Sequence, residues 1–80
     1  MNISQAVATR IRQLLTQKKM TQYKLEQVSG LSHDTIKSIM KGKAKGVNLR
    51  TLILISYGFG ISAIEFLNCD LFNYENLNID

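Results

Sequence analysis

Apolar side chains recur at intervals of three and four positions along most of the chain, with short polar breaks between the groups. In the first group they are Val7, Ile11, Leu14 and Leu15, which predicts a helix with one buried face. The chain contains no proline, so no residue of that type interrupts the helices. The pattern favours an all-α fold of five short helices in a single domain.

The segment at residues 21–43 predicts two short helices joined by a tight turn. Thr21 is a candidate cap for the first of them, and Leu25 and Val28 give that helix an inward face. Gly30 marks its end, because glycine can reverse the chain there without a Cβ penalty. Only about three or four residues remain for the turn, so the two helices must cross steeply.

The second helix of this pair is expected to run from about Ser32, its cap, to Lys41. Ile36, Ile39 and Met40 are spaced to form its inward face. The opposite face carries charged and hydrogen-bonding groups, on His33, Asp34, Lys37, Ser38 and Lys41. A helix held out by a rigid turn, with such a face, suits the width of the major groove of DNA.

Two further helices are expected after a basic loop, GKAKG, at residues 42–46. Asn48 is a candidate cap for the fourth helix, which ends near Gly58 or Gly60. Ser62 and Glu65 have the spacing of a capping box at the start of the fifth, each side chain bonding the other residue's amide. The expected inward residues of the fourth helix are Leu49, Leu52, Ile53 and Ser56.

The formal net charge of +4 conceals an uneven distribution along the chain. Residues 1–50 hold all ten Lys and Arg against two acidic residues, whereas residues 51–80 hold four acidic residues and no Lys or Arg. For any single lysine, a solvated surface position is the simpler interpretation. The concentration of positive charge in the half that contains the helix pair favours nucleic acid as a partner.

The chain resembles the Cro and phage-repressor type of helix-turn-helix protein, also called the XRE family, over roughly residues 7 to 68. The resemblance rests on an ordered set of short motifs with the family's spacing. These are Thr21 and Gln22, Leu25, Gly30, Ser32, Ile36, Gly42 and Lys43, Leu49, Leu52, Ile55, Gly60 to Ser62, and Glu65 to Leu67. The resemblance implies a lambda-repressor-like DNA-binding domain at residues 1–68, followed by a tail at residues 69–80.

The resemblance also implies a function and a set of contacts. The function is sequence-specific transcriptional regulation by a homodimer that inserts the helix from about Ser32 to Lys41 into the major groove of a palindromic operator. Base contacts are expected from His33, Asp34, Lys37 and Ser38. Phosphate contacts are expected from Gln22, Tyr23, Lys41, Lys43 and Lys45. The family pattern further implies a pair between Gln22 and His33 at the edge of the groove.

Three of these side chains have simpler interpretations that stay open. Asp34 lies in a first helical turn, where the helix dipole favours a carboxylate without any DNA contact. It can also accept a hydrogen bond from a cytosine amino group. His33 is either an ordinary surface histidine or a group that reaches a base or phosphate, and Tyr23 is either a phosphate donor or a partly packed aromatic.

Two departures from the family pattern change the expected packing. Glu26 replaces a small residue, and a buried carboxylate there would cost several kcal/mol. It must therefore reach solvent, or the helices must sit slightly apart. An arginine and glutamate that many members pair are replaced by Leu15 and Met40, and the loss of both charges predicts a packed contact between these two side chains.

The tail at residues 69–80 is polar and acidic but retains several apolar residues. They are Leu71, Phe72, Tyr74, Leu77 and Ile79. One interpretation is a frayed end with some residues packed back on the core. The other, which we favour, is a self-association element, because these side chains have no obvious place in a five-helix core.

Several functional classes are disfavoured. One cysteine, Cys69, and one histidine, His33, cannot build an internal disulfide or a metal site, and neither a catalytic set nor a phosphate-binding glycine loop is evident. The longest apolar stretch, residues 52–64, is too short to cross a bilayer, and no signal peptide is apparent. We expect a cytoplasmic, non-enzymatic protein without a cofactor or small-molecule substrate.

Two other functions remain as alternatives. The same fold can serve chiefly as a protein-binding module, such as an antitoxin-like partner that uses the tail to hold another protein, with DNA binding secondary. It can also serve as an architectural DNA binder without sequence preference.

Overall fold

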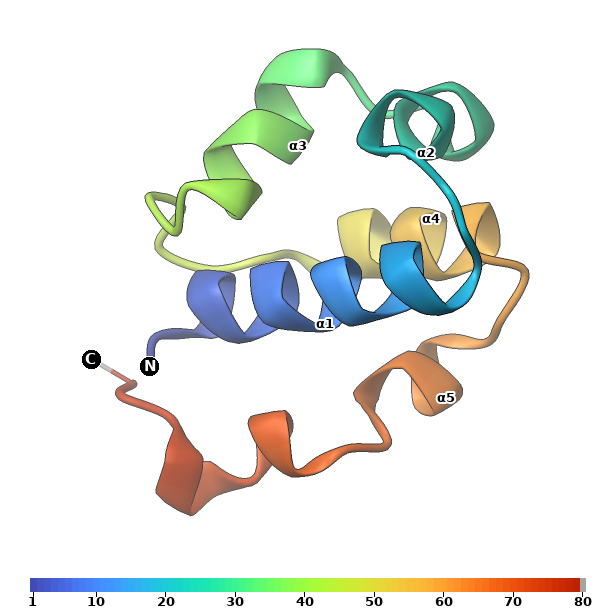
Figure 1. Ribbon diagram of the computed structural model, residues 1–80. Helices are drawn as coiled ribbons and strands as arrows, with labels where there is room; N and C mark the ends of the chain where they lie inside the picture. Colours follow the sequence, from blue (N-terminus) through green and yellow to red (C-terminus); the bar gives the residue numbers. More distant parts are fainter. Residues whose placement is uncertain (80) are drawn as a thin grey trace.

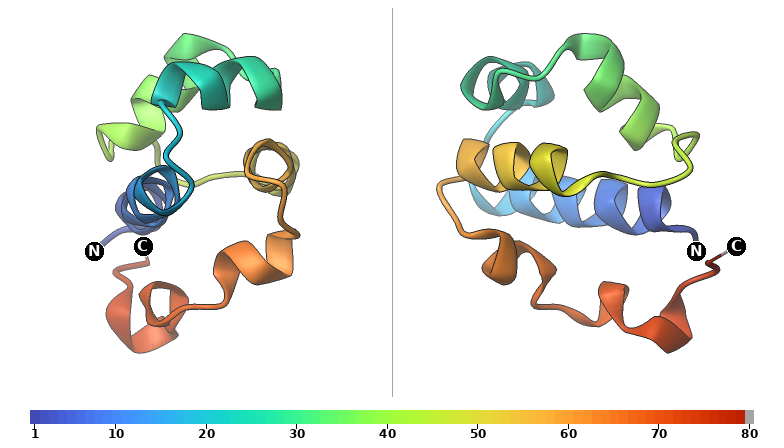
Figure 2. Two further views of the ribbon diagram at one scale, coloured as in Figure 1. Left: turned by 45° about the vertical axis from the view of Figure 1, so that its right-hand side comes forward. Right: turned by 180° about the vertical axis from the view of Figure 1, so that it is seen from behind.

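The computed structural model describes residues 1–79 and contains only helical elements within them. The elements are α1 (Ile3–Gln17), α2 (Gln22–Ser29), α3 (His33–Met40), α4 (Leu49–Gly58), α5 (Ala63–Leu67) and the 3₁₀ turns η1 (Asp70–Phe72) and η2 (Tyr74–Asn76). Helices α2 and α3 lie on one side of α1 and α4, and α5 and the tail lie on the other (Figures 1 and 2). The expected all-α fold of five short helices is confirmed.

Each of the five α-helices is preceded by an N-cap residue whose polar side chain accepts a hydrogen bond from the amide of the third helical residue. Thr21, Ser32, Asn48 and Ser62 do so as predicted, at 2.8 to 3.1 Å. Asn2 caps α1 in the same way at 2.7 Å, and the Gln5 side chain accepts from the Asn2 amide at 2.9 Å. The reciprocal capping box is therefore formed at α1. At α5, the capping box predicted for Ser62 and Glu65 is wrong in its second half, because within residues 1–79 only the serine side chain makes its bond.

The core lies between the two outer layers and draws on every α-helix. Helix α3 packs on α1, α2 packs on α4, and α5 packs on α4. The buried side chains of the core are Val7, Ile11, Leu14, Leu25, Ile36, Ile39, Leu52, Ile55, Phe59 and Phe66. The predicted inward faces of α1 and α3 are confirmed at Val7, Ile11, Leu14, Ile36 and Ile39, while Leu15 and Met40 pack on the core without being fully buried.

The predicted inward face of α4 is wrong at two positions. Leu49 and Ile53 point to solvent, and Thr51 and Ile55 occupy the inward positions beside Leu52. Because α4 is apolar on both sides, hydrophobic periodicity does not fix its rotation about its own axis. That rotation is set by the side chains that reach the core.

The inward face predicted for α2 holds only in part. Leu25 is fully buried, but Val28 is exposed, and the second buried residue of the helix is Ser29. The Ser29 hydroxyl donates to the Glu26 carbonyl and accepts from the Leu31 amide. A small polar residue with both bonds made is compatible with burial next to the turn.

The tail packs back on the domain through its described residues. Phe72 contacts Phe66 with ring centroids 6.0 Å apart, and η1 lies against α1. The N-terminal ammonium donates to the Asn76 carbonyl, and the Asn78 amide donates to the Met1 carbonyl at 2.8 Å. These contacts bring residues 76–78 beside the N-terminus. Tyr74 and Ile79 remain exposed, and Asp80 lies outside the described residues.

Within residues 1–79 no helix has both the length and the apolar character needed to cross a bilayer.

Replacing Ile55 with Val should lower the free energy of unfolding by about 0.5–1.5 kcal/mol, because the lost methylene leaves a gap in the core. The matched replacement Ile53→Val should change it by less than about 0.5 kcal/mol, because that side chain faces solvent. Urea denaturation of both variants measures the difference. Equal losses at the two positions would contradict the rotation of α4 described above.

Candidate nucleic-acid interface

The turn between α2 and α3 is closed by glycine in a left-handed conformation. Gly30 has φ of +75°, and its amide donates to the Glu26 carbonyl at 3.1 Å. Residues 30–32 are all that separates the two helices, and Leu31 within them packs on the core. The predicted glycine turn is confirmed, and it fixes the direction in which α3 leaves α2.

The far end of α3 is held by three separate contacts. The Ser4 hydroxyl donates to the Ile39 carbonyl at 3.1 Å, and the Arg12 guanidinium donates to the Met40 carbonyl at 2.9 Å. Gly42, with φ of +68°, closes a Schellman motif in which the Lys43 amide donates to the Ser38 carbonyl. These bonds satisfy the carbonyls that the helix end leaves free and tie α3 to α1.

With both ends fixed, α3 turns its polar side outward as predicted. His33, Asp34, Lys37 and Lys41 are exposed, and Ser38 is half-buried. Within residues 1–79 no hydrogen bond or ion pair involves the side chains of Asp34 or Lys37. These groups are therefore available to a molecule outside the chain.

The carboxylate of Glu26 links α2 to the first residue of α3. Its Oε2 lies 2.9 Å from Nδ1 of His33 and 3.4 Å from Nε2 of Gln22. The Glu26 side chain is 12% exposed, whereas the His33 side chain is 63% exposed. The carboxylate thus gains two polar partners, which is why a charge at this small-residue position is tolerated.

Within residues 1–79 no hydrogen bond joins Gln22 directly to His33, and the two side chains are linked through the Glu26 carboxylate. Their pairing at the edge of the groove stays a prediction. An ionised carboxylate only accepts hydrogen bonds, so in this contact Nδ1 of His33 carries the proton. The other ring nitrogen, Nε2, is then left as an acceptor in the neutral ring and as a donor in the imidazolium.

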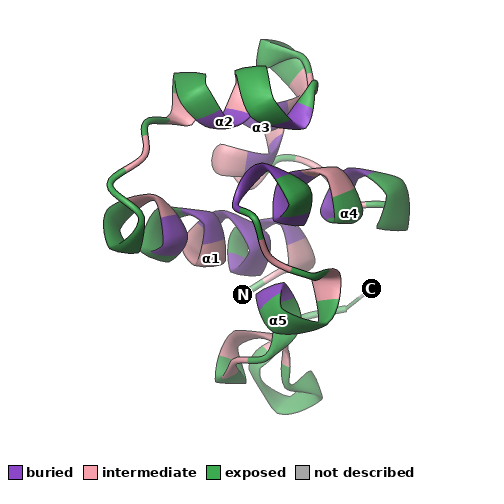
Figure 3. Ribbon diagram, turned by 90° about the vertical axis from the view of Figure 1, so that its right-hand side faces the viewer, coloured by how far each residue is buried: buried purple, intermediate pink, exposed green. Residues whose placement is uncertain are grey.

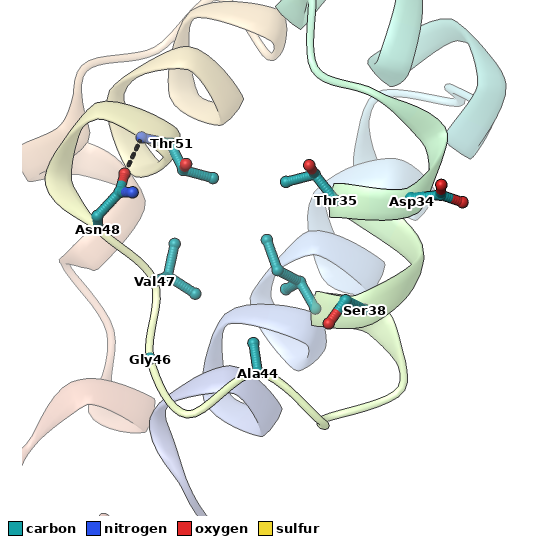
Figure 4. Close-up of a pocket in the computed structure, with 9 residues that line it drawn as sticks. Asp34, Thr35, Ser38, Ala44, Gly46, Val47, Asn48 and Thr51 are labelled. Atoms are coloured by element: carbon teal, nitrogen blue, oxygen red, sulfur yellow. Dashed lines mark hydrogen bonds between the residues drawn. The ribbon is translucent and has the colours of Figure 1, made fainter.

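A groove of about 400 Å³ separates α3 from the segment that leads into α4. Thr35 projects into it from α3, Val47 faces it from the opposite side, and Asn48 forms the cap of α4 at its edge (Figure 4). Asp34 also lines this groove, and its side chain is exposed (Figure 4). The loop at residues 42–46 and the outer side of α3 therefore border the same surface.

Two groups of basic residues differ in their surroundings. Lys41, Lys43 and Lys45 are exposed beside the end of α3, and none of them forms an ion pair within residues 1–79. By contrast, Arg10 donates to the carbonyls of Phe66 and Glu65 at 2.8 and 3.0 Å and lies over the Phe66 ring. Arg10 thus ties α1 to α5, as Arg12 ties α1 to α3.

The remaining site residues lie on α2. Tyr23 is exposed and its hydroxyl accepts a hydrogen bond from Gln27 at 3.0 Å, so it is not the packed aromatic of the simpler interpretation. Gln22 is half-buried beside Glu26. Sequence reasoning did not identify the roles of Glu26 and Arg12, since both depend on partners distant in the sequence or across the turn.

Removal of the Glu26 carboxylate should change the tautomer of His33. In alkaline buffer, where the ring is neutral, wild-type His33 should carry its proton on Nδ1, and Glu26→Ala should shift the population toward the Nε2–H form. Glu26→Gln is the matched control, because its amide oxygen still accepts a bond from Nδ1 without the charge. Long-range ¹H–¹⁵N correlation spectra of the imidazole report the tautomer. An identical tautomer in all three proteins would mean that the Glu26–His33 contact does not hold the ring.

Comparison with known proteins agrees with this geometry. Residues 10–71 match the family model described as the Cro/C1-type HTH DNA-binding domain. No curated protein and no solved structure matches the chain. The match covers most of the 80 residues and includes α2, the Gly30 turn and α3, which confirms the resemblance described above. The chain therefore belongs to the Cro/C1-type helix-turn-helix family and is a DNA-binding transcriptional regulator.

Proposed function

We propose that the chain reads a specific DNA sequence by placing α3 in the major groove, and that it does so as a homodimer on a palindromic operator. The observation that carries this proposal is the outer side of α3, where polar groups stay free although both ends of the helix are fixed. Fixed donors and acceptors discriminate base pairs because the major groove presents a different pattern for each.

The exposed side of α3 supplies the base contacts. His33 presents Nε2 as a donor or acceptor, since Glu26 occupies Nδ1. Asp34 is exposed, and its carboxylate can accept from a cytosine amino group. Lys37 and Ser38 lie one turn further along, where lysine can reach guanine acceptors and serine can contact either type of base.

Phosphate contacts flank this helix on both sides. Lys41, Lys43 and Lys45 lie beyond its C-terminus, and Gln22 and Tyr23 lie at the start of α2. Contacts of this kind add affinity and fix the position of the protein on the duplex without reading sequence. Gln22 also bonds Glu26, so the same amide connects a phosphate contact to the side chain that orients His33.

Two copies are proposed because one short helix reads few base pairs. Half-sites on successive turns of one DNA face are about 34 Å apart. The longest extent of the chain is 32 Å, so two copies in direct contact fit this spacing. A palindromic operator follows from the two-fold symmetry of such a pair.

Replacing Lys41, Lys43 or Lys45 with Ala should reduce the slope of log K against log salt by roughly one unit for each phosphate that the variant no longer neutralises. Fluorescence anisotropy with a selected duplex, from low to moderate salt, measures the slope. Lys18→Ala removes the same charge from an exposed position at the end of α1, outside the proposed contacts, and serves as a control. An unchanged slope in all three loop variants would remove residues 41–45 from the interface.

Asp34→Ala should change the preferred DNA sequence at one base pair of each half-site, where discrimination of about 1–3 kcal/mol disappears. Selection of bound fragments from a random DNA pool, for wild type and variant, gives the preference directly. The Lys45→Ala variant should keep the wild-type preference with weaker binding. If Asp34→Ala keeps that preference too, the carboxylate acts only on the α3 dipole.

A further inference from the structure

Helix α4 exposes apolar side chains along one side. Leu49, Ile53 and Tyr57 follow each other at intervals of four residues and are 66%, 49% and 68% exposed. Ile64, on the adjoining α5, is 83% exposed. We call these four residues the α4–α5 apolar surface, and Figure 3 shows exposed segments on both helices. A helix that is apolar on both sides normally has a second surface packed against it.

The size of this surface distinguishes it from scattered exposed residues. Full coverage of its four side chains would remove roughly 500 Å² from water, which is in the upper range of apolar patches on monomeric proteins. In a two-fold pair the same side chains would bury about 1,000 Å² in total, which reaches the lower bound for a specific interface. Surrounding atoms add to this area.

Three properties of the surface favour a second copy of the chain as the partner. First, its four side chains carry no charge, so two chains of net charge +4 can meet here without placing like charges in contact at the centre. Secondly, Leu49 directly follows Asn48, which borders the groove beside α3, so the surface adjoins the candidate DNA interface. Thirdly, direct contact between copies fits the spacing of successive major grooves, as described above.

The tail offers a weaker alternative. Phe72 is used within the chain, in contact with Phe66, and Leu71 and Leu77 are half-buried. Tyr74 and Ile79 are exposed but do not lie on a common helix. Three of the five apolar side chains that favoured self-association of residues 69–80 are therefore at least half-buried within the chain.

We infer that the α4–α5 apolar surface is the contact between the two copies of the DNA-binding homodimer, packed around a two-fold axis with Ile53 near its centre. The inference rests on the homodimer of the proposed function and identifies the surface that forms it. Residues of the tail lie outside this contact.

Size-exclusion chromatography with light scattering tests the inference. The wild type should show twice the 9.1 kDa mass of one chain at high micromolar concentration. Ile53→Glu should weaken the dimer at least tenfold and show one chain's mass at the same concentration. Tyr74→Glu, the control at an exposed apolar residue of the tail, should remain dimeric. Circular dichroism checks that both variants keep their helix content.

Should Ile53→Glu fail to fold, the double variant Leu49→Ser, Tyr57→Ser tests the same surface without adding charge. A wild-type protein that stays monomeric at all concentrations would overturn the inference, as would dissociation by Tyr74→Glu but not by Ile53→Glu. Capture of another protein by wild-type monomers would assign the surface to that protein instead.

DNA binding separates this inference from the proposed function. Ile53→Glu should retain sequence-selective binding to a duplex with one half-site. For wild type, a second half-site increases the affinity, and in Ile53→Glu this increase should be at least tenfold smaller. A wild-type dimer without sequence selectivity would contradict the proposed function while supporting the dimer surface. If the wild type is sequence-selective and Ile53→Glu binds the full palindrome as tightly as wild type, the result would support the proposed function and contradict the dimer surface.

Discussion

The left-handed backbone at Gly30 is the constraint on which the direction of α3 depends. With three residues between two helices, the chain must reverse within one turn, and a side chain with a Cβ at φ of +75° would be strained. Leu31 then enters the core and Ser32 caps α3, so the geometry of the turn is fixed on both sides. The polar side of α3 faces outward because of this turn and because Ile36 and Ile39 are buried on the opposite side.

Polar contacts over long sequence distances make the same geometry rigid. Ser4 and Arg12 bond the last carbonyls of α3, and Arg10 bonds the carbonyls of α5, so α1 holds both outer layers. Each of these bonds ends on a backbone carbonyl, which does not depend on the identity of the partner side chain. Glu26 differs, because it bonds two side chains and so links the first residue of α3 to the amide of Gln22. It therefore influences how α3 presents its first polar group.

Several features that depend on neighbours in the sequence could be predicted from the sequence. The caps at Thr21, Ser32, Asn48 and Ser62 each involve an amide three residues away, and the Gly30 turn is equally local. The rotation of α4 could not be predicted, because isoleucine or leucine occupies both of its sides. The partners of Glu26 and Arg12 could not be predicted either, since the contacts arise only when helices come together. The tail was ambiguous for the same reason: its apolar residues alone do not show that Phe72 meets Phe66.

The central claim is that the outer side of α3, and not another surface of the chain, meets DNA. Amide chemical-shift mapping with a selected duplex measures this most directly. The largest changes should fall in residues 22–23, 33–38 and 41–45, with small changes in η1 and η2, which lie on the opposite side of the domain. Changes concentrated in α5 and the tail, with α3 unaffected, would contradict the claim.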